Sequence, residues 1–78
     1  QVYLYVLHDL GSLELDPAAA GFNAVISGHS HIPKIEKRDD ILYLNPGSAG
    51  PKRFDYPISI AFLYIKGTSI ETEIVELK

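Results

Sequence analysis

The sequence predicts an α/β fold in which a strand–helix–strand unit is followed by antiparallel hairpins. Residues 2–7 and 24–27 are short, continuous apolar runs, which are typical of strands buried on both faces. A segment with helix-capping residues separates these two runs. Residues 34–44 and 58–77 each contain two strand-like runs joined by turn residues, as in a hairpin.

The strand–helix–strand unit occupies the first third of the chain. Residues 2–7 read Val-Tyr-Leu-Tyr-Val-Leu and end at His8. Asp16 suits the N-cap of a helix, Pro17 its first position and Gly21 its end, so we expect one short helix over residues 16–21. Residues 24–27 form the next strand, and this spacing favours a parallel pair.

Two hairpins are expected in the remainder. Residues 34–37 alternate, residues 38–40 turn, and residues 41–44 return. Residues 45–57 hold three prolines and two glycines and predict an irregular loop. Residues 58–65 and 70–77 form the second hairpin around a turn at 66–69.

One short helix cannot cover two apolar parallel strands on both faces. This deficit predicts that the chain is part of a larger domain. We therefore expect an apolar face that is exposed, or buried either against another copy or against a missing N-terminal portion.

Composition narrows the possible functions. Seven Lys and Arg against ten Asp and Glu give a formal charge of −3, which lacks the basic footprint of a nucleic-acid-binding surface. No apolar run approaches the roughly 20 residues of a membrane span, and no signal peptide opens the chain, so we expect a cytoplasmic protein without a membrane partner. Because cysteine is absent, a metal site would have to use His, Asp, Glu or Asn.

All three histidines follow predicted parallel strands. His8 ends the first strand, and His29 and His31 follow the second, after Gly28. The carboxyl ends of parallel strands are where α/β sheets place their sites. In extended backbone, residues two apart project to the same side. A His-x-His pair alone is more often a surface pair, but this placement favours a metal site whose ring nitrogens converge from His8, His29 and His31.

The carboxylates near His8 match no ligand pattern. Asp16 is better explained as a helix cap and Glu14 as a solvated charge, and Asp9 has no partner at a recognisable spacing. Three imidazoles without a carboxylate bring no negative charge to offset that of a divalent cation. We therefore expect the isolated chain to bind divalent metal weakly.

A specific resemblance is carried by two motifs. Residues 24–31, Ala-Val-Ile-Ser-Gly-His-Ser-His, and residues 44–48, Leu-Asn-Pro-Gly-Ser, resemble the closing motifs of calcineurin-like metallophosphoesterases. The likeness is greatest to their compact bacterial and archaeal phosphodiesterase branch, which also resembles a retromer scaffold subunit. It covers nearly the whole chain. The resemblance implies a four-layer α/β/β/α sandwich, with residues 1–78 as the C-terminal portion of a single domain whose N-terminal portion is absent.

The resemblance also implies a site for two divalent metal ions, which could be Mn, Mg, Ni or Zn. His8 and His29 match ligands of the second metal, and His31 matches a ligand of the first. The family's upstream Asp-x-His, Gly-Asp and Gly-Asn-His motifs are absent from this sequence. Asn45 and Arg53 are candidate substrate contacts, although a structural turn explains Asn45 more simply and a solvated charge explains Arg53.

The implied function is hydrolysis of a phosphodiester, or of a phosphomonoester, by a metal-bound hydroxide. This chain would supply three histidine ligands to the intact hydrolase and be inactive alone. The alternative is a non-catalytic, protein-binding scaffold of the same fold. The presence of all three histidines favours the enzyme.

Overall fold

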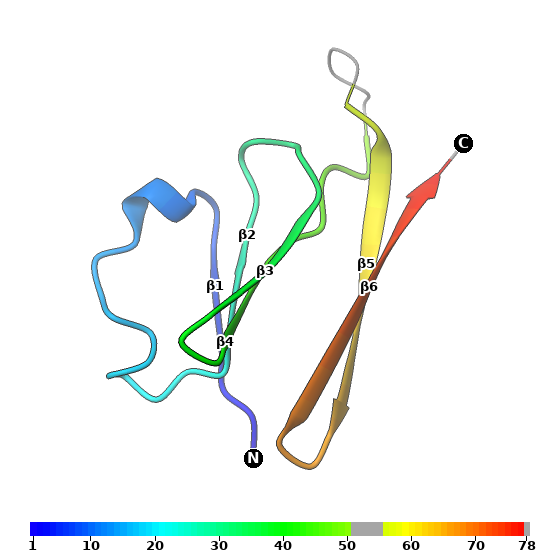
Figure 1. Cartoon of the computed structure of the whole chain (residues 1–78). Coiled ribbons are helices and arrows are strands. Elements are labelled where there is room, and N and C mark those ends of the chain that lie inside the picture. Colours follow the sequence, from blue (N-terminus) through cyan, green and yellow to red (C-terminus); the bar gives the residue numbers. More distant parts are fainter. Residues whose placement is uncertain (51–55, 78) are drawn as a thin grey trace.

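A computed structural model describes residues 1–50 and 56–77, which form two sheets (Figure 1). The four-stranded sheet has the order β1-β2-β4-β3, and the other sheet is the β5-β6 hairpin. The strands are β1 (Leu4–Leu7), β2 (Ala24–Ser27), β3 (Lys34–Arg38), β4 (Ile41–Asn45), β5 (Ile58–Lys66) and β6 (Ser69–Leu77). A short 3-10 helix, η1 (Leu10–Ser12), follows β1.

The strand pairing confirms the predicted parallel unit and both predicted hairpins. β1 runs parallel to β2, and β2 runs parallel to β4. β3 pairs antiparallel with β4, so that Lys34 lies opposite Asn45. Because β1, β2 and β4 are parallel, their carboxyl ends meet at one edge of the sheet.

The turn between β3 and β4 has a two-residue tip. Asp39 and Asp40 have φ angles of 50° and 62°. Two successive positive φ angles are the signature of a type I′ turn, whose twist matches that of the flanking strands. The predicted turn at residues 38–40 is thus confirmed, with Arg38 paired in β3.

The prediction of a helix at residues 16–21 is wrong. Asp16 accepts a hydrogen bond from the Ala18 N–H at 3.1 Å, as an N-cap would, and Ala20 N donates to Asp16 O at 2.9 Å. The segment then ends in turns, with Gly21 at a φ of 87°. So few residues cannot repay the cost of helix nucleation, and the capping chemistry therefore forms only a turn.

The hydrophobic core is small and lies on the two central strands. Its buried members are Ala24, Val25, Ile41, Leu42 and Leu44. On the edge strand β1, by contrast, Val6 is 68% exposed. The expected exposure of apolar side chains is therefore found on β1, whereas Ala24 and Val25 of β2 are fully buried by the chain's own residues, contrary to the expectation for that strand. Within the described residues, no helix has the length and apolar character required to cross a membrane.

The β5-β6 hairpin is connected to the sheet through the loop after β4. Ser59 is 1% exposed, and its hydroxyl donates to Pro46 O at 2.8 Å. Ser59 N donates to Ser48 O at 2.9 Å. Figure 1 shows the hairpin on one side of the four-stranded sheet and the segment that contains η1 on the other. Two hydrogen bonds from Ser59, to Pro46 O and Ser48 O, therefore hold the loop after β4 beside the start of β5.

Candidate metal centre

The candidate site lies at the sheet edge where three parallel strands end. His8 directly follows β1, residues 28–31 follow β2, and Asn45 is the last residue of β4. Gly28 N donates to His8 O at 2.9 Å, which joins the first two of these segments. Strand order thus gathers residues that are far apart in the chain.

His8 and His29 face each other across this edge. Their Nε2 and Nδ1 atoms are 3.1 Å apart, and the ring planes are nearly perpendicular, at 81°. One nitrogen donates and the other accepts, according to which of them carries the proton. Two nitrogens bound to one zinc-like ion at right or tetrahedral angles would lie about 2.9–3.4 Å apart, so the observed separation fits ligands of a shared ion.

His31 does not complete this pair. Among residues 1–50 and 56–77, no three His, Cys, Asp or Glu side chains form a group that could hold a metal ion. His31 Nδ1 is nonetheless buried and has no hydrogen-bond partner in the described structure. A buried polar atom without a partner costs free energy. This nitrogen is therefore suited to contact an ion or a polar group supplied from outside the described residues.

The backbone of the His-x-His segment differs from the expected extended form. His29 and His31 have φ angles of 70° and 64°. Left-handed backbone is uncommon in residues other than glycine, and it persists only where surrounding contacts maintain it. The reason for expecting neighbouring rings, namely two residues of an extended strand on one side, was therefore wrong.

The nearby carboxylates have structural partners. Asp9 is the N-cap of η1 and accepts from Gly11 N at 3.0 Å. Asp16 caps the turn described above. These contacts agree with the structural interpretation of Asp16 and assign a similar one to Asp9.

Asn45 is engaged by protein groups on both sides of its amide. Its nitrogen donates to Gly28 O at 3.1 Å and to Ser30 Oγ at 3.0 Å, and its oxygen accepts from Gly47 N at 2.9 Å. These contacts support the structural interpretation of its loop. Sequence reasoning missed Ser30, because its partner is 15 residues away and no local pattern indicates it. Arg53, the other candidate substrate contact, lies outside the described residues.

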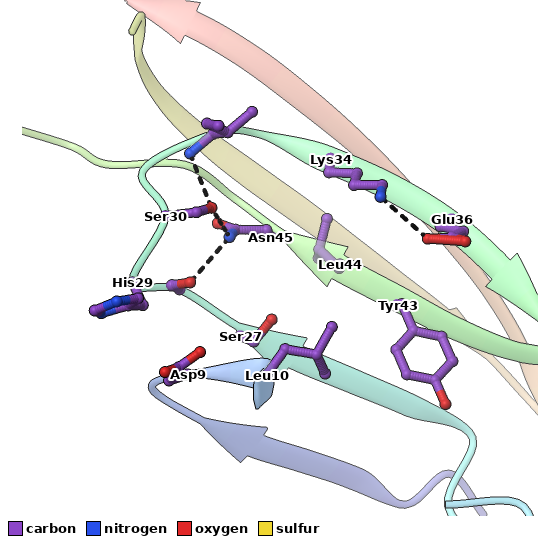
Figure 2. A pocket seen from close by; sticks show the side chains of 12 residues that line it. Asp9, Leu10, Ser27, His29, Ser30, Lys34, Glu36, Tyr43, Leu44 and Asn45 are labelled. Atoms are coloured by element: carbon purple, nitrogen blue, oxygen red, sulfur yellow. Dashed lines mark hydrogen bonds and ion pairs between the residues drawn. The ribbon is translucent and has the colours of Figure 1, made fainter. Parts of the chain in front are cut away.

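A cleft of about 430 Å³ extends from His29 along the sheet. Figure 2 shows Asp9 and His29 at one end and Tyr43 at the other, with Leu10 between them. On its rim, Lys34 forms an exposed ion pair with Glu36 at 3.3 Å, which stabilises little because water screens it. The cleft therefore offers a mainly apolar approach to the His8–His29 pair.

Comparison with known sequences identifies one family. The profile of the calcineurin-like phosphoesterase superfamily domain matches residues 2–68. A probable metallophosphoesterase from Methanothermobacter thermautotrophicus is 40% identical over 55 residues. That match covers 70% of this chain and 31% of the relative, so the chain spans about a third of the relative's length.

Three solved structures share the fold. A conserved uncharacterised protein from Streptococcus pneumoniae, a predicted phosphoesterase, has a TM-score of 0.63 at 23% identity, over 77% of this chain and 35% of its own. Vacuolar protein sorting 29 from Cryptosporidium parvum has a TM-score of 0.56 at 21% identity, over 88% and 44%. Vps29 from Entamoeba histolytica, solved with zinc, has a TM-score of 0.57 at 23% identity, over 87% and 47%. At these identities the likeness shows the fold alone.

Proposed function

Because this chain belongs to the calcineurin-like phosphoesterase superfamily, we propose that it supplies metal ligands to a site that hydrolyses phosphoesters. His8 and His29 bind one divalent ion, and His31 is a ligand of a second. The observation that carries the proposal is the 3.1 Å separation of His8 Nε2 and His29 Nδ1 at the carboxyl edge of the parallel strands.

The donor set suits a divalent transition metal. Neutral imidazole is a good ligand for zinc and nickel, whereas magnesium and manganese prefer oxygen, so among the four metals considered the histidines favour zinc or nickel. The Entamoeba protein of the same fold, solved with zinc, supports this choice. When bound, such ions supply Lewis-acid stabilisation of charge on a phosphoryl oxygen. The histidines bind only with the ligating nitrogen deprotonated, so affinity falls as pH is lowered.

The 78-residue chain is proposed to contribute only part of the site. Its described residues bring no carboxylate to the His8–His29 pair, so nothing offsets the charge of a divalent ion there. We therefore propose that the chain alone binds metal weakly and has no measurable phosphodiesterase activity. The complete domain, of which the matched segment is 31% in the archaeal relative, would act on phosphodiesters or phosphomonoesters.

A protein-binding scaffold is the second candidate. Two of the structural neighbours are Vps29 proteins, and the described chain leaves large apolar side chains such as Val6 and Phe62 exposed. A scaffold needs the fold and not the metal. Loss of the histidines would therefore leave its partner binding unchanged.

A chimera tests the enzymatic proposal. The matched segment of the Methanothermobacter relative is replaced by the matching segment of this chain, and hydrolysis of bis(p-nitrophenyl) phosphate is measured with Mn²⁺. We expect activity in the chimera and loss of at least about a hundredfold when His29 or His31 is changed to Ala. The matched control is the unmodified relative, assayed under the same conditions. A folded chimera that hydrolyses equally well with and without these histidines would contradict the proposal.

A further inference from the structure

We propose that Asn45 is a positioning residue for the metal-ligating loop, since its amide holds residues 28–30 in the conformation that brings His29 to His8. The inference rests on the proposed metal site and goes beyond it, because Asn45 would act through the loop without binding the metal. Figure 2 shows the Asn45 amide directed at this loop from the neighbouring strand β4.

The Asn45 side chain joins two segments that follow different strands. Both described donor contacts of its amide nitrogen go to the loop after β2, at Gly28 O and Ser30 Oγ. Its amide oxygen accepts from Gly47 N, which belongs to the loop after β4. The Asn45 side chain thereby connects the two loops, in addition to the pairing of β2 with β4.

The loop after β2 needs such support. His29 has left-handed backbone, which is strained for a residue other than glycine. Gly28 is held on both sides: its N–H donates to His8 O at 2.9 Å, and its carbonyl accepts from Asn45 and from Ser30 N, the latter at 2.8 Å. Because the carbonyl of Gly28 and the N–H of His29 share one peptide plane, fixing that carbonyl fixes the direction of the His29 N–Cα bond. The left-handed φ of His29 then sets where its side chain leaves the main chain.

The contacts require an amide at position 45. Asparagine provides two donors and an acceptor, and all three roles are used. Aspartate has nearly the same shape and could still accept from Gly47 N, but it would place a second acceptor against the Gly28 carbonyl. Asn45→Asp therefore removes the positioning contact with little change in volume.

Asn45 is itself fixed by the next residues. Pro46 O accepts from the hydroxyl of Ser59, which is almost completely buried in β5. Gly47, whose N–H binds Asn45, has a φ of 80° and leaves no room for a side chain beside Ser59. Contacts with β5 thus hold residues 46–47 in place, these residues hold Asn45, and Asn45 holds the loop after β2.

The experiment compares Asn45→Asp, Asn45→Ala and Ser30→Ala in the 78-residue chain. Thr72→Ala is the matched control, since it also removes one side-chain hydrogen bond to a main-chain carbonyl, at 2.9 Å to Phe62 O, far from the loop. Two readouts are taken well below the unfolding temperature. One is Zn²⁺ affinity by calorimetry. The other is nuclear Overhauser data on metal-free protein, in which a strong intraresidue HN–Hα effect reports positive φ at His29 and His31, and ring contacts report the His8–His29 pair.

We expect Asn45→Asp and Asn45→Ala to lose the positive-φ signals and the ring contact and to bind Zn²⁺ about tenfold more weakly or worse, as for lost outer-shell partners of other metal sites. Ser30→Ala, which keeps the Gly28 contact, should lose less, and Thr72→Ala nothing. Retention of both readouts in folded Asn45→Asp would overturn the proposal. A parent chain with no measurable Zn²⁺ binding, yet one that loses its loop conformation on Asn45→Asp, would support the positioning role independently of the metal function, which the chimera tests.

Discussion

The Nε2 atom of His8 lies 3.1 Å from the Nδ1 atom of His29, although 21 positions separate them in the chain. The contact depends on the parallel register of β1 and β2, in which Leu7 lies opposite Ser27. It joins the two histidines that the family resemblance assigns to the same metal ion.

Removal of either histidine should weaken binding of that ion. We expect His8→Ala and His29→Ala each to lower Zn²⁺ affinity by more than the roughly 10–100-fold typical of outer-shell losses, because a direct ligand is removed. The double variant should bind scarcely more weakly than either single variant, since one remaining imidazole already holds the ion poorly. Calorimetric titration at pH 7.5 measures this. If the double variant instead loses the sum of the two single-variant losses in Zn²⁺ binding free energy, the two residues bind separate ions.

The glycine of the loop after β4 should not tolerate a side chain. Gly47→Ala adds a Cβ that overlaps Ser59 Oγ and lies 3.2 Å from Pro33 Cδ, at a φ of 80°. The backbone conformation alone costs about 1–2 kcal/mol, and the overlap adds to it, so we expect the free energy of unfolding to fall by more than about 2 kcal/mol in urea titrations.

Gly67→Ala is the control for this variant, because Gly67 has a φ of 62° but no atom within 4 Å of an added Cβ. It should show the backbone cost without the overlap. In addition, Ser59→Ala should recover part of the loss in a Gly47→Ala background. Equal destabilisation by the two glycine variants would contradict the steric explanation.

An alkaline titration should reveal the contact between Tyr64 and Glu73. The Tyr64 hydroxyl donates to Glu73 Oε1 at 3.0 Å, and this hydrogen bond, followed by desolvation and the carboxylate charge, raises the pKa of Tyr64 above its ordinary value of 10.0. Because the folded-state pKa is the higher one, the contact stabilises the fold below pH 10 and is lost as pH rises through the raised pKa.

Glu73→Gln should therefore lower the pKa of Tyr64, as followed by the absorbance of tyrosinate. Tyr64→Phe identifies the contribution of this residue among the five tyrosines. Tyr64→Phe should also remove the part of the fall in thermal stability above pH 10 that comes from this contact. An unchanged tyrosinate titration in Glu73→Gln would show that the hydrogen bond does not persist in solution.

Self-association should depend on the open edge of the four-stranded sheet. Val6, Ile26, Leu44 and Ile35 lie in one register row across the four strands, and the two end members, Val6 and Ile35, are exposed. An exposed apolar edge strand favours pairing with another chain, which a charged side chain opposes. Val6→Lys should thus reduce concentration-dependent association in sedimentation velocity.

Thr68→Lys, at the exposed tip of the β5-β6 hairpin, adds the same charge elsewhere and should leave association unchanged. A parent chain that stays monomeric at all concentrations would contradict the expectation, as would equal effects of the two lysines.

The strands were predictable because their signals are local. The apolar runs at residues 24–27 and 41–44 supply most of the buried core, and turn residues delimit both hairpins. The turns at residues 16–21 were not predicted. Capping residues indicate where a helix can begin, but not whether the helix is long enough to offset the cost of nucleation. Tertiary contacts did not extend this turn into a helix.

The candidate site was predictable in part of its members and not in its geometry, since His31 does not join the His8–His29 pair and no local pattern indicated Ser30. Strand ends and the His-x-His pattern identified His8 and His29, which the structure brings together. The left-handed backbone of residues 29 and 31 accompanies contacts from Asn45, 17 positions beyond Gly28, and no local rule predicts a conformation that a distant amide maintains.

The β3-β4 hairpin begins and finishes at the edge of the sheet that carries the histidines, because Lys34, the first residue of β3, is paired with Asn45, the last residue of β4. The hairpin can therefore lengthen or shorten at its far tip, by matched residues on the two arms, without moving Asn45. A single extra residue in β4 alone would instead turn the Asn45 side chain to the opposite face of the sheet. Insertions at Asp39 and Asp40 are thus compatible with an intact site, whereas unmatched insertions along either arm are not.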